Sequence, residues 1–261
     1  MVEIVRVRLI EKKESEGCEE APISILESFK KIMARENGIP LLKESLRFEE
    51  IHVSLDDYAE ADHLIFENGK EIFERNFKSF FIGGDTSILS PLLKAFNHVE
   101  RNPLSFIFDA HGGGSILDMR HRNWLRRLLE KQFRGSSVIL IGSRIYEREE
   151  LSYLKKQGVF AMDISLIQED KEGICDLLME RANTTSGFFL AIDFDSVDPA
   201  FAPGVSSPEV GGVSSRDLLY FIKRFVILKN LKGAALLGIN PRYDIQNITC
   251  KLGARVLAEL L

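Results

Sequence analysis

The sequence predicts an α/β domain of three layers, in which a central, mostly parallel sheet lies between two layers of helices. Short, continuously apolar runs recur along the chain, as in strands that are buried on both faces of a parallel sheet. Helix-like segments of roughly 10–15 residues separate these runs, which is typical of right-handed βαβ crossovers. Because 261 residues is an ordinary length for one such domain, we expect residues 1–261 to form a single α/β domain.

The elements can be assigned in chain order. Alternating apolar residues over 1–10 predict a first strand. Apolar runs predict further strands over 77–82, 104–108, 137–142, 159–162, 188–193 and 232–239. Helical patterning predicts helices over 124–133, 147–156, 214–227 and 245–261. The first of these helices has an apolar stripe that includes Trp124, and Ser214 is a favourable N-cap for the third.

Composition disfavours several classes of function. A net charge of −5 gives no basic surface for nucleic acid. The sequence has no apolar run of the ~20 residues that a membrane span requires, and its start has no apolar core of a secretory signal. Its cysteines, Cys18, Cys175 and Cys250, are odd in number and widely spaced. We therefore expect a cytoplasmic protein that binds neither nucleic acid nor membrane.

Acidic motifs follow two of the predicted strands. Asp109 and His111 come directly after residues 106–108, while Asp193 and Asp195 follow residues 188–192. Residues two apart in a strand share a face, so we expect each pair to point the same way. Three carboxylates and an imidazole at buried strand ends are costly unless a cation joins them. This ligand set, rich in oxygen and without thiolate, suits Mn²⁺ better than Zn²⁺.

Structural explanations compete with functional ones at several positions. Aspartates after a strand can simply cap a turn, and Asp198, before Pro199, is expected to bond nearby backbone. The glycines over 112–114 lack the third glycine of a dinucleotide fingerprint, because Leu117 stands in its place. We interpret them as a tight turn, which disfavours a nucleotide-binding module.

The motifs resemble those of the ureohydrolases, the family of arginases and agmatinases. Residues 83–87 (GGDTS) are similar to the family's G-G-D-H-S, and residues 108–113 (FDAHGG) to its D-A-H-x-D. Residues 193–204 (DFDSVDPAFAPG) are close to D-x-D-x-x-D-P-x-x-A-P-G, and residues 207–213 continue it as T-P-x-x-G-G-L. Residues 238–244 (GINPRYD) stand where the family has E-x-N-P-x-x-D. The resemblance implies an arginase-like fold, in agreement with the periodicity.

The resemblance also implies a metal site. Family enzymes hold two Mn²⁺ ions bridged by a hydroxide that attacks a guanidinium carbon and releases urea. The ligands of one ion are kept here, as Asp109, His111, Asp193 and Asp195. We therefore expect one divalent metal ion per chain, with Mn²⁺ favoured. A substitute ligand for the second ion is conceivable in Asp118.

Three family positions are degenerate in this sequence. Thr86 replaces a histidine ligand of the second ion, and Gly113 replaces an aspartate ligand. Gly238 replaces the glutamate that pairs with the substrate's guanidinium, a charge-assisted contact worth roughly 1.5–3 kcal/mol. His121 matches the mobile histidine that shuttles protons, although the loop before it is shorter than in the family. The resemblance therefore argues against a standard arginase or agmatinase.

Two functions remain open from the sequence. The first is a metal-dependent hydrolase of a linear amidine, guanidino or amide C–N bond, with His121 as proton carrier and a small guanidino- or amidine-type substrate. The alternative is a catalytically inactive ureohydrolase-fold protein with a binding, assembly or regulatory role. Because relatives are often trimers or hexamers, the resemblance also implies a homo-oligomer.

Overall fold

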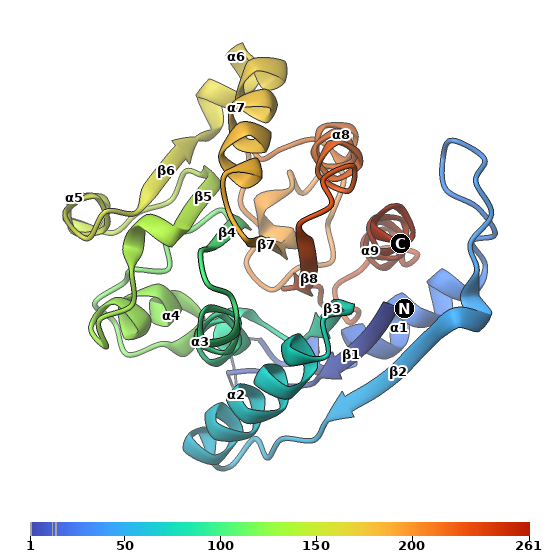
Figure 1. Cartoon of the computed structure of the whole chain (residues 1–261), viewed down its shortest axis with the longest axis horizontal. Coiled ribbons are helices and arrows are strands. Elements are labelled where there is room, and N and C mark those ends of the chain that lie inside the picture. Colours follow the sequence, from blue (N-terminus) through green and yellow to red (C-terminus); the bar gives the residue numbers. More distant parts are fainter. Residues whose placement is uncertain (1, 12, 14) are drawn as a thin grey trace.

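A computed structural model describes residues 2–11, 13 and 15–261 of the chain. These residues contain one eight-stranded sheet in the order β2-β1-β3-β8-β7-β4-β5-β6, and every neighbouring pair is parallel. Helices cover both faces of the sheet (Figure 1). The predicted fold class is therefore confirmed, with a sheet that is parallel throughout the described chain.

The strands are β1 (Val2–Val7), β2 (Leu46–Ile51), β3 (Lys78–Gly83), β4 (Pro103–Phe108), β5 (Val138–Ser143), β6 (Phe160–Asp163), β7 (Gly187–Asp193) and β8 (Leu231–Leu237). The helices are α1 (Ala21–Lys30), α2 (Tyr58–Glu74), α3 (Leu89–Val99), α4 (Arg120–Leu129), α5 (Glu150–Lys156), α6 (Ile164–Glu169), α7 (Lys171–Asn183), α8 (Ser215–Phe225) and α9 (Ile248–Leu260). The predicted strands lie within a few residues of these bounds. The predicted helix over 124–133 begins four residues earlier, at Arg120, and ends at Leu129.

The two faces of the sheet carry separate apolar cores. Alternate residues of a strand point to opposite faces, so Phe106 and Phe108 of β4 pack with α8, whereas Ile107 packs on the other side. One core takes its helical residues from α1, α6, α7, α8 and α9, and the other takes them from α2, α3, α4 and α5. Trp124 is fully buried in the second core, as its place on an apolar stripe predicts.

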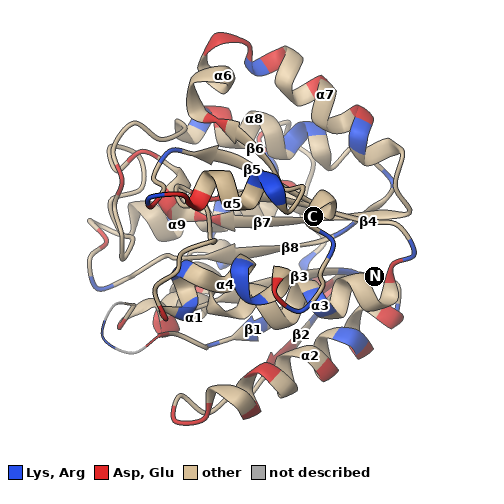
Figure 2. Cartoon of the chain, turned by 90° about the vertical axis from the view of Figure 1, so that its left-hand side faces the viewer, with Lys and Arg blue, Asp and Glu red and all other residues tan. Residues whose placement is uncertain are grey.

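Charged residues lie mostly on the outer surfaces of the helices and on the loops. Figure 2 shows mostly Asp and Glu along α2, for example, with Lys70 among them, while the central strands carry few charged residues. No helix in the described part of the chain is long and apolar enough to cross a membrane. Strand β2 was not expected from the sequence, because this edge strand alternates charged residues with a half-exposed Phe48 in place of a continuous apolar run.

The order of the strands places the two acidic motifs side by side. Strand β7 lies between β4 and β8, with Ile192 opposite Phe108 and Asp193 opposite Leu237. Because all these strands are parallel, their carboxyl ends meet at one edge of the sheet. Asp109, which follows β4, and Gly238, which follows β8, therefore flank Asp193 at this edge.

Candidate metal centre

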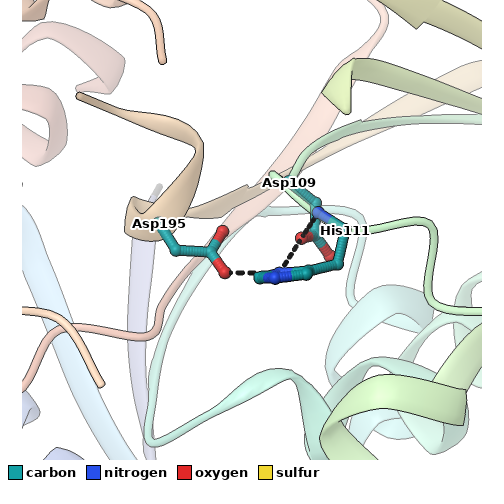
Figure 3. A group of neighbouring side chains, drawn as sticks. All are labelled: Asp109, His111 and Asp195. Atoms are coloured by element: carbon teal, nitrogen blue, oxygen red, sulfur yellow. Dashed lines mark hydrogen bonds and ion pairs between the residues drawn. The ribbon is translucent and has the colours of Figure 1, made fainter. Parts of the chain in front are cut away.

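Three buried side chains meet at the carboxyl edge of the sheet. Asp109, His111 and Asp195 offer ligand atoms that all lie within 4.8 Å of one another (Figure 3). The Nδ1 atom of His111 is 2.8 Å from Oδ2 of Asp195 and 3.6 Å from Oδ1 of Asp109. Two carboxylates and an imidazole in this arrangement are a donor set that suits a divalent cation. The structure thus brings together three of the four predicted metal ligands.

Tight turns, not the alternation of an extended strand, aim these side chains. The Oδ1 atom of Asp109 accepts a hydrogen bond of 2.7 Å from the amide of His111, and Oδ1 of Asp193 accepts one of 3.0 Å from the amide of Asp195. Asp195 lies in a 3₁₀ turn over Phe194–Ser196. The first aspartate of each motif therefore caps a turn that redirects the residue two positions later. Each pair faces the same cavity, as expected, but turns and not the pleat of a strand place the second residue.

Asp193 lies in the same cavity but outside the group of three. Its carboxylate is buried, accepts from the amide of Asp195, and borders Gly238. The cavity has a volume of about 30 Å³, enough for an ion and a water molecule. Its walls also include Asp85, Thr86, His121, Arg122 and Ser207. The cavity is thus small, and four of the residues that line it are acidic.

Burial and mutual repulsion perturb the acids of this cavity. Burial, and then the charge of Asp195, raises the pKa of Asp109 above its ordinary value. The same two causes, with the charge of Asp109 added, raise the pKa of Asp193 further. Burial acts to raise the pKa of Asp195 as well, but the hydrogen bond with His111, the charge of His111 and the amide of Ala110 together outweigh burial and lower the pKa. Without a cation, the cavity therefore favours bound protons that a metal ion would displace.

His111 is held from both sides. Burial acts to lower its pKa, but the hydrogen bonds with Asp109 and Asp195 outweigh burial and raise the pKa to about 10. Its Nε2 atom lies 3.2 Å from Oε1 of Glu209. A carboxylate on the far nitrogen orients the ring so that Nδ1 faces the acids, as is typical of metal-binding histidines. Glu209 was not predicted; its only sequence signal is its place in the motif over 207–213.

At two of the degenerate positions, the backbone conformation requires glycine. Gly113 has φ of +67° and Gly238 has φ of +76°, a region that L side chains rarely adopt. A Cβ atom at position 113 would collide with the indole of Trp124, and one at position 238 would overlap the carboxylate of Asp193. Neither position can therefore take an acidic side chain without rearrangement. Asp118 is exposed, and it is not among the described residues that line the cavity.

Thr86, the third degenerate position, contacts the segment that carries His121. Its hydroxyl donates a hydrogen bond of 2.7 Å to the carbonyl oxygen of His121. The Nδ1 atom of His121 lies 2.7 Å from Oε2 of Glu11, which also accepts from the His121 amide at 3.2 Å. Glu11 was not predicted, because it lies 110 positions away along the chain in a charged segment. His121 is thus held at the cavity wall by a carboxylate and a threonine.

Asp198 has the structural role that its place before a proline predicts. Its carboxylate accepts hydrogen bonds from the amides of Ala200 and Gly211, at 2.9 and 2.7 Å. These bonds, led by the one from Ala200, lower its pKa. Asp198 therefore fixes the loop after β7 and is not one of the acids grouped with His111.

The fold and this buried Asp/His/Asp cluster define an α/β protein with a candidate divalent-metal site at the carboxyl edge of its sheet. The sequence model of the Arginase family matches residues 5–261. The chain therefore belongs to the arginase family, as the resemblance of its motifs implies.

Known proteins of several specificities are similar to this chain. Mitochondrial arginase 1 of Oryza sativa subsp. indica is 28% identical over 211 residues, which cover 76% of this chain and 59% of the arginase. Guanidinobutyrase of Pseudomonas aeruginosa is 28% identical over 216 residues, covering 77% and 65% of the two chains. The chain thus spans about three fifths of the length of these curated relatives. The crystal structure of Bacillus subtilis formimidoylglutamase superposes with a TM-score of 0.91 at 24% identity, covering 99% of this chain and 85% of that one.

Proposed function

We propose that the protein is a metal-dependent hydrolase that cleaves a C–N bond of a linear guanidino or amidino compound. One divalent ion, with Mn²⁺ favoured, would be held by Asp109, His111, Asp193 and Asp195. The observation that carries this proposal is the buried group of ligand atoms within 4.8 Å at the cavity. Membership of the arginase family supports the reaction class, since relatives of this chain are named as arginases, a guanidinobutyrase and a formimidoylglutamase.

The acidic residues would hold the ion and balance its charge. When bound, a divalent cation lowers the pKa of a coordinated water towards 7 and so supplies a nucleophile at neutral pH. Glu209 keeps the His111 ring in place through the 3.2 Å contact at Nε2, so that Nδ1 is the nitrogen that would bind an ion. The turn capped by Asp193 holds Asp195 at the cavity, beside His111.

His121 is proposed to carry protons during the reaction. Its Nδ1–H donates to Glu11, which fixes the tautomer and leaves Nε2 to take up or deliver a proton. Burial acts to raise the pKa of Glu11, but its hydrogen bonds with His121 outweigh burial and keep this pKa low. Glu11 is therefore ionised at neutral pH and can stabilise an imidazolium at His121.

The substrate is proposed to differ from arginine and agmatine. Gly238 offers no carboxylate to a guanidinium, and the overlap with Asp193 excludes one at this position. A strongly cationic group would therefore lack its counter-charge beside the metal ion. Thr86 and Gly113 also favour a single ion. Because they replace two metal ligands, they favour the second candidate function, a non-catalytic member of the family.

The homo-oligomer and the cytoplasmic location remain predictions from the sequence.

Metal content and product release together test the proposal. We expect one tightly bound divalent ion per chain by elemental analysis after extensive dialysis. We also expect release of urea, ammonia or formamide from a panel of guanidino and amidino compounds. His121→Asn should lower turnover by about 10²–10⁴-fold, the range for a general acid or base. His98→Asn, which changes an exposed histidine on α3, is the matched control and should leave turnover unchanged.

Each outcome of this test has one meaning. Two ions per chain would contradict the single-ion site. One ion without any product release would favour the non-catalytic function. Equal turnover in the His121 and His98 variants would remove His121 from the mechanism while leaving the hydrolase intact.

A further inference from the structure

An arginine faces the acidic cavity from the first turn of α4. Arg122 follows His121 directly and lines the same cavity as Asp109, Asp193 and Asp195. Its Nη2 atom donates a hydrogen bond of 3.0 Å to the hydroxyl of Ser207, which lines the cavity as well. A cation at this place is unexpected in a site that would bind a divalent metal ion, unless the arginine binds another anion.

The backbone that carries Arg122 is fixed in place. Thr86 binds the carbonyl oxygen of His121, and Glu11 binds both the amide and the ring of the same residue. The amide of Arg122 donates to the carbonyl of Met119 at 2.9 Å. The Arg122 side chain is therefore fixed at its backbone end by this turn and at its guanidinium end by Ser207. A donor that is already in position loses little conformational entropy when it binds a ligand.

The chemistry of the guanidinium indicates which ligand it takes. It carries several N–H donors in a planar fork. Among the described residues, only Ser207 accepts a hydrogen bond from this guanidinium, so the other donors are available to a ligand. The fork matches a carboxylate, which it can bind through two parallel hydrogen bonds. Asp109, Asp193 and Asp195, which line the same cavity, would be engaged by the metal ion. A carboxylate that arrives with the substrate is therefore the natural partner.

Beside Arg122, the cavity offers donors to an anion and lacks the family's carboxylate at position 238. Arg122, Ser206 and Ser207 are among the residues that line the cavity and offer hydrogen-bond donors, while Gly238 provides no side chain beside Asp193. A substrate with an ammonium group would bring a positive charge towards Arg122. A substrate with a carboxylate would instead pair with it and direct its C–N group towards the acidic cluster.

We propose that Arg122, positioned by Thr86, Glu11 and Ser207, binds a carboxylate of the substrate. The substrate class is then an amidino or guanidino acid, not an amidino or guanidino amine. This inference rests on the proposed function, because it assumes that the acidic cluster holds the ion that acts on the C–N bond. It assigns Arg122 to substrate binding and gives Thr86 a positioning role.

A matched pair of probes tests this assignment. The compounds 4-guanidinobutanoate and agmatine share a guanidinium and a methylene chain, but one ends in a carboxylate and the other in an ammonium. Binding of each to the Mn²⁺-loaded protein is measured by calorimetry, and kcat/KM replaces the Kd where a probe is hydrolysed. The wild type should prefer the carboxylate probe at least tenfold. Arg122→Gln should weaken that probe by about 10- to 100-fold, as expected for a lost charge-assisted hydrogen bond, and leave agmatine no weaker.

Two further variants keep the test decisive. Arg127 lies on the same helix as Arg122 but pairs with Asp62 outside the cavity. Arg127→Gln should therefore leave the preference for the carboxylate probe unchanged. Arg122→Lys keeps the charge but not the fork, so it should retain part of the preference. Thermal unfolding of the Arg122→Gln protein within a few degrees of wild type shows that the variant folds. If it does not fold, the comparison rests on Arg122→Lys, which must then lose at least part of the preference.

The outcomes separate this inference from the proposed function. Tighter binding of agmatine, equal effects of the Arg122 and Arg127 variants, or binding of neither probe would overturn the inference. Hydrolysis of agmatine in preference to 4-guanidinobutanoate, by the wild type and the Arg122→Gln variant alike, would keep the hydrolase and reject the carboxylate site. Arg122-dependent binding of 4-guanidinobutanoate without hydrolysis of any probe would keep the carboxylate site and reject the hydrolase.

Discussion

Replacing Gly238 by alanine should damage the candidate metal centre although it adds only one methyl group. Position 238 follows β8 at the edge of the cavity and has φ of +76°. An added Cβ would overlap the carboxylate of Asp193, which must then move or force the backbone to move. We therefore expect Gly238→Ala to lower both the free energy of unfolding and the affinity for a divalent ion.

The magnitude has two parts, and a second glycine separates them. A non-glycine residue with positive φ costs about 1–2 kcal/mol, and forced overlap in a packed region costs about 1–3 kcal/mol more. Gly211 has the same φ of +76°, yet nothing lies within 4 Å of the point that a Cβ atom would occupy there. Gly211→Ala should therefore lose about 1–2 kcal/mol, and Gly238→Ala about 2–5 kcal/mol. The difference isolates the contact with Asp193.

Urea denaturation of both variants, with and without Mn²⁺, measures these quantities. A constant slope against urea allows the midpoints to be compared as free energies. Metal content after dialysis shows whether Asp193 still functions as a ligand. Equal losses of stability in the two variants, with full metal content in both, would refute the reasoning from steric overlap.

Two other predictions concern the metal ion. Mn²⁺ at 100 times its Kd should stabilise the wild type by about 2.7 kcal/mol, and the combined change Asp193→Ala and Asp195→Ala should abolish this effect in thermal unfolding; an undiminished effect would place the ion elsewhere. In EDTA-treated protein, His111 has its pKa raised from 6.5 to about 10, so its contribution to stability is complete below pH 6.5 and is lost as the pH rises towards 10. The free energy of unfolding should therefore fall across this pH range. It should fall less in the Mn²⁺-loaded protein, because the ion would replace the proton on Nδ1. Identical profiles would argue that the ion does not contact His111.

The sequence predicted the features that are local, and it missed those that depend on distant contacts. Apolar runs identified most strands, and the acids at their ends identified Asp109 and Asp195, because parallel strands bring their carboxyl ends together. Glu11 and Glu209 had no such signal, since each reaches its histidine across about 100 residues of chain. The role of Gly238 was equally hidden, because a sequence gives the residue but not the sign of φ.

The edge strand β2 and the 3₁₀ turn after β7 show the same limit of prediction from hydrophobic patterns. Strand β2 has charged residues on one face, where Arg47 and Glu49 form ion pairs, and so has no continuous apolar run. Asp193 and Asp195 were expected to point the same way because of the pleat, but the 3₁₀ turn after Asp193 decides the direction of Asp195. Hydrogen bonds of the capping side chain determine a turn of three residues. Hydrophobic periodicity cannot predict these bonds.

The place of β8 in the sheet has a consequence for how the protein is made. Strands β2, β1 and β3 form one half of the sheet and β7, β4, β5 and β6 the other, and β8 alone joins them. Yet β8 is formed by residues 231–237, which follow all the other described strands in the sequence. On a ribosome the two halves can collapse separately, but they cannot be joined until this last strand has left the exit tunnel. The cavity takes Thr86 from the first half and Asp109 from the second, so the nascent chain can form this cavity only after residues 231–237 have been made.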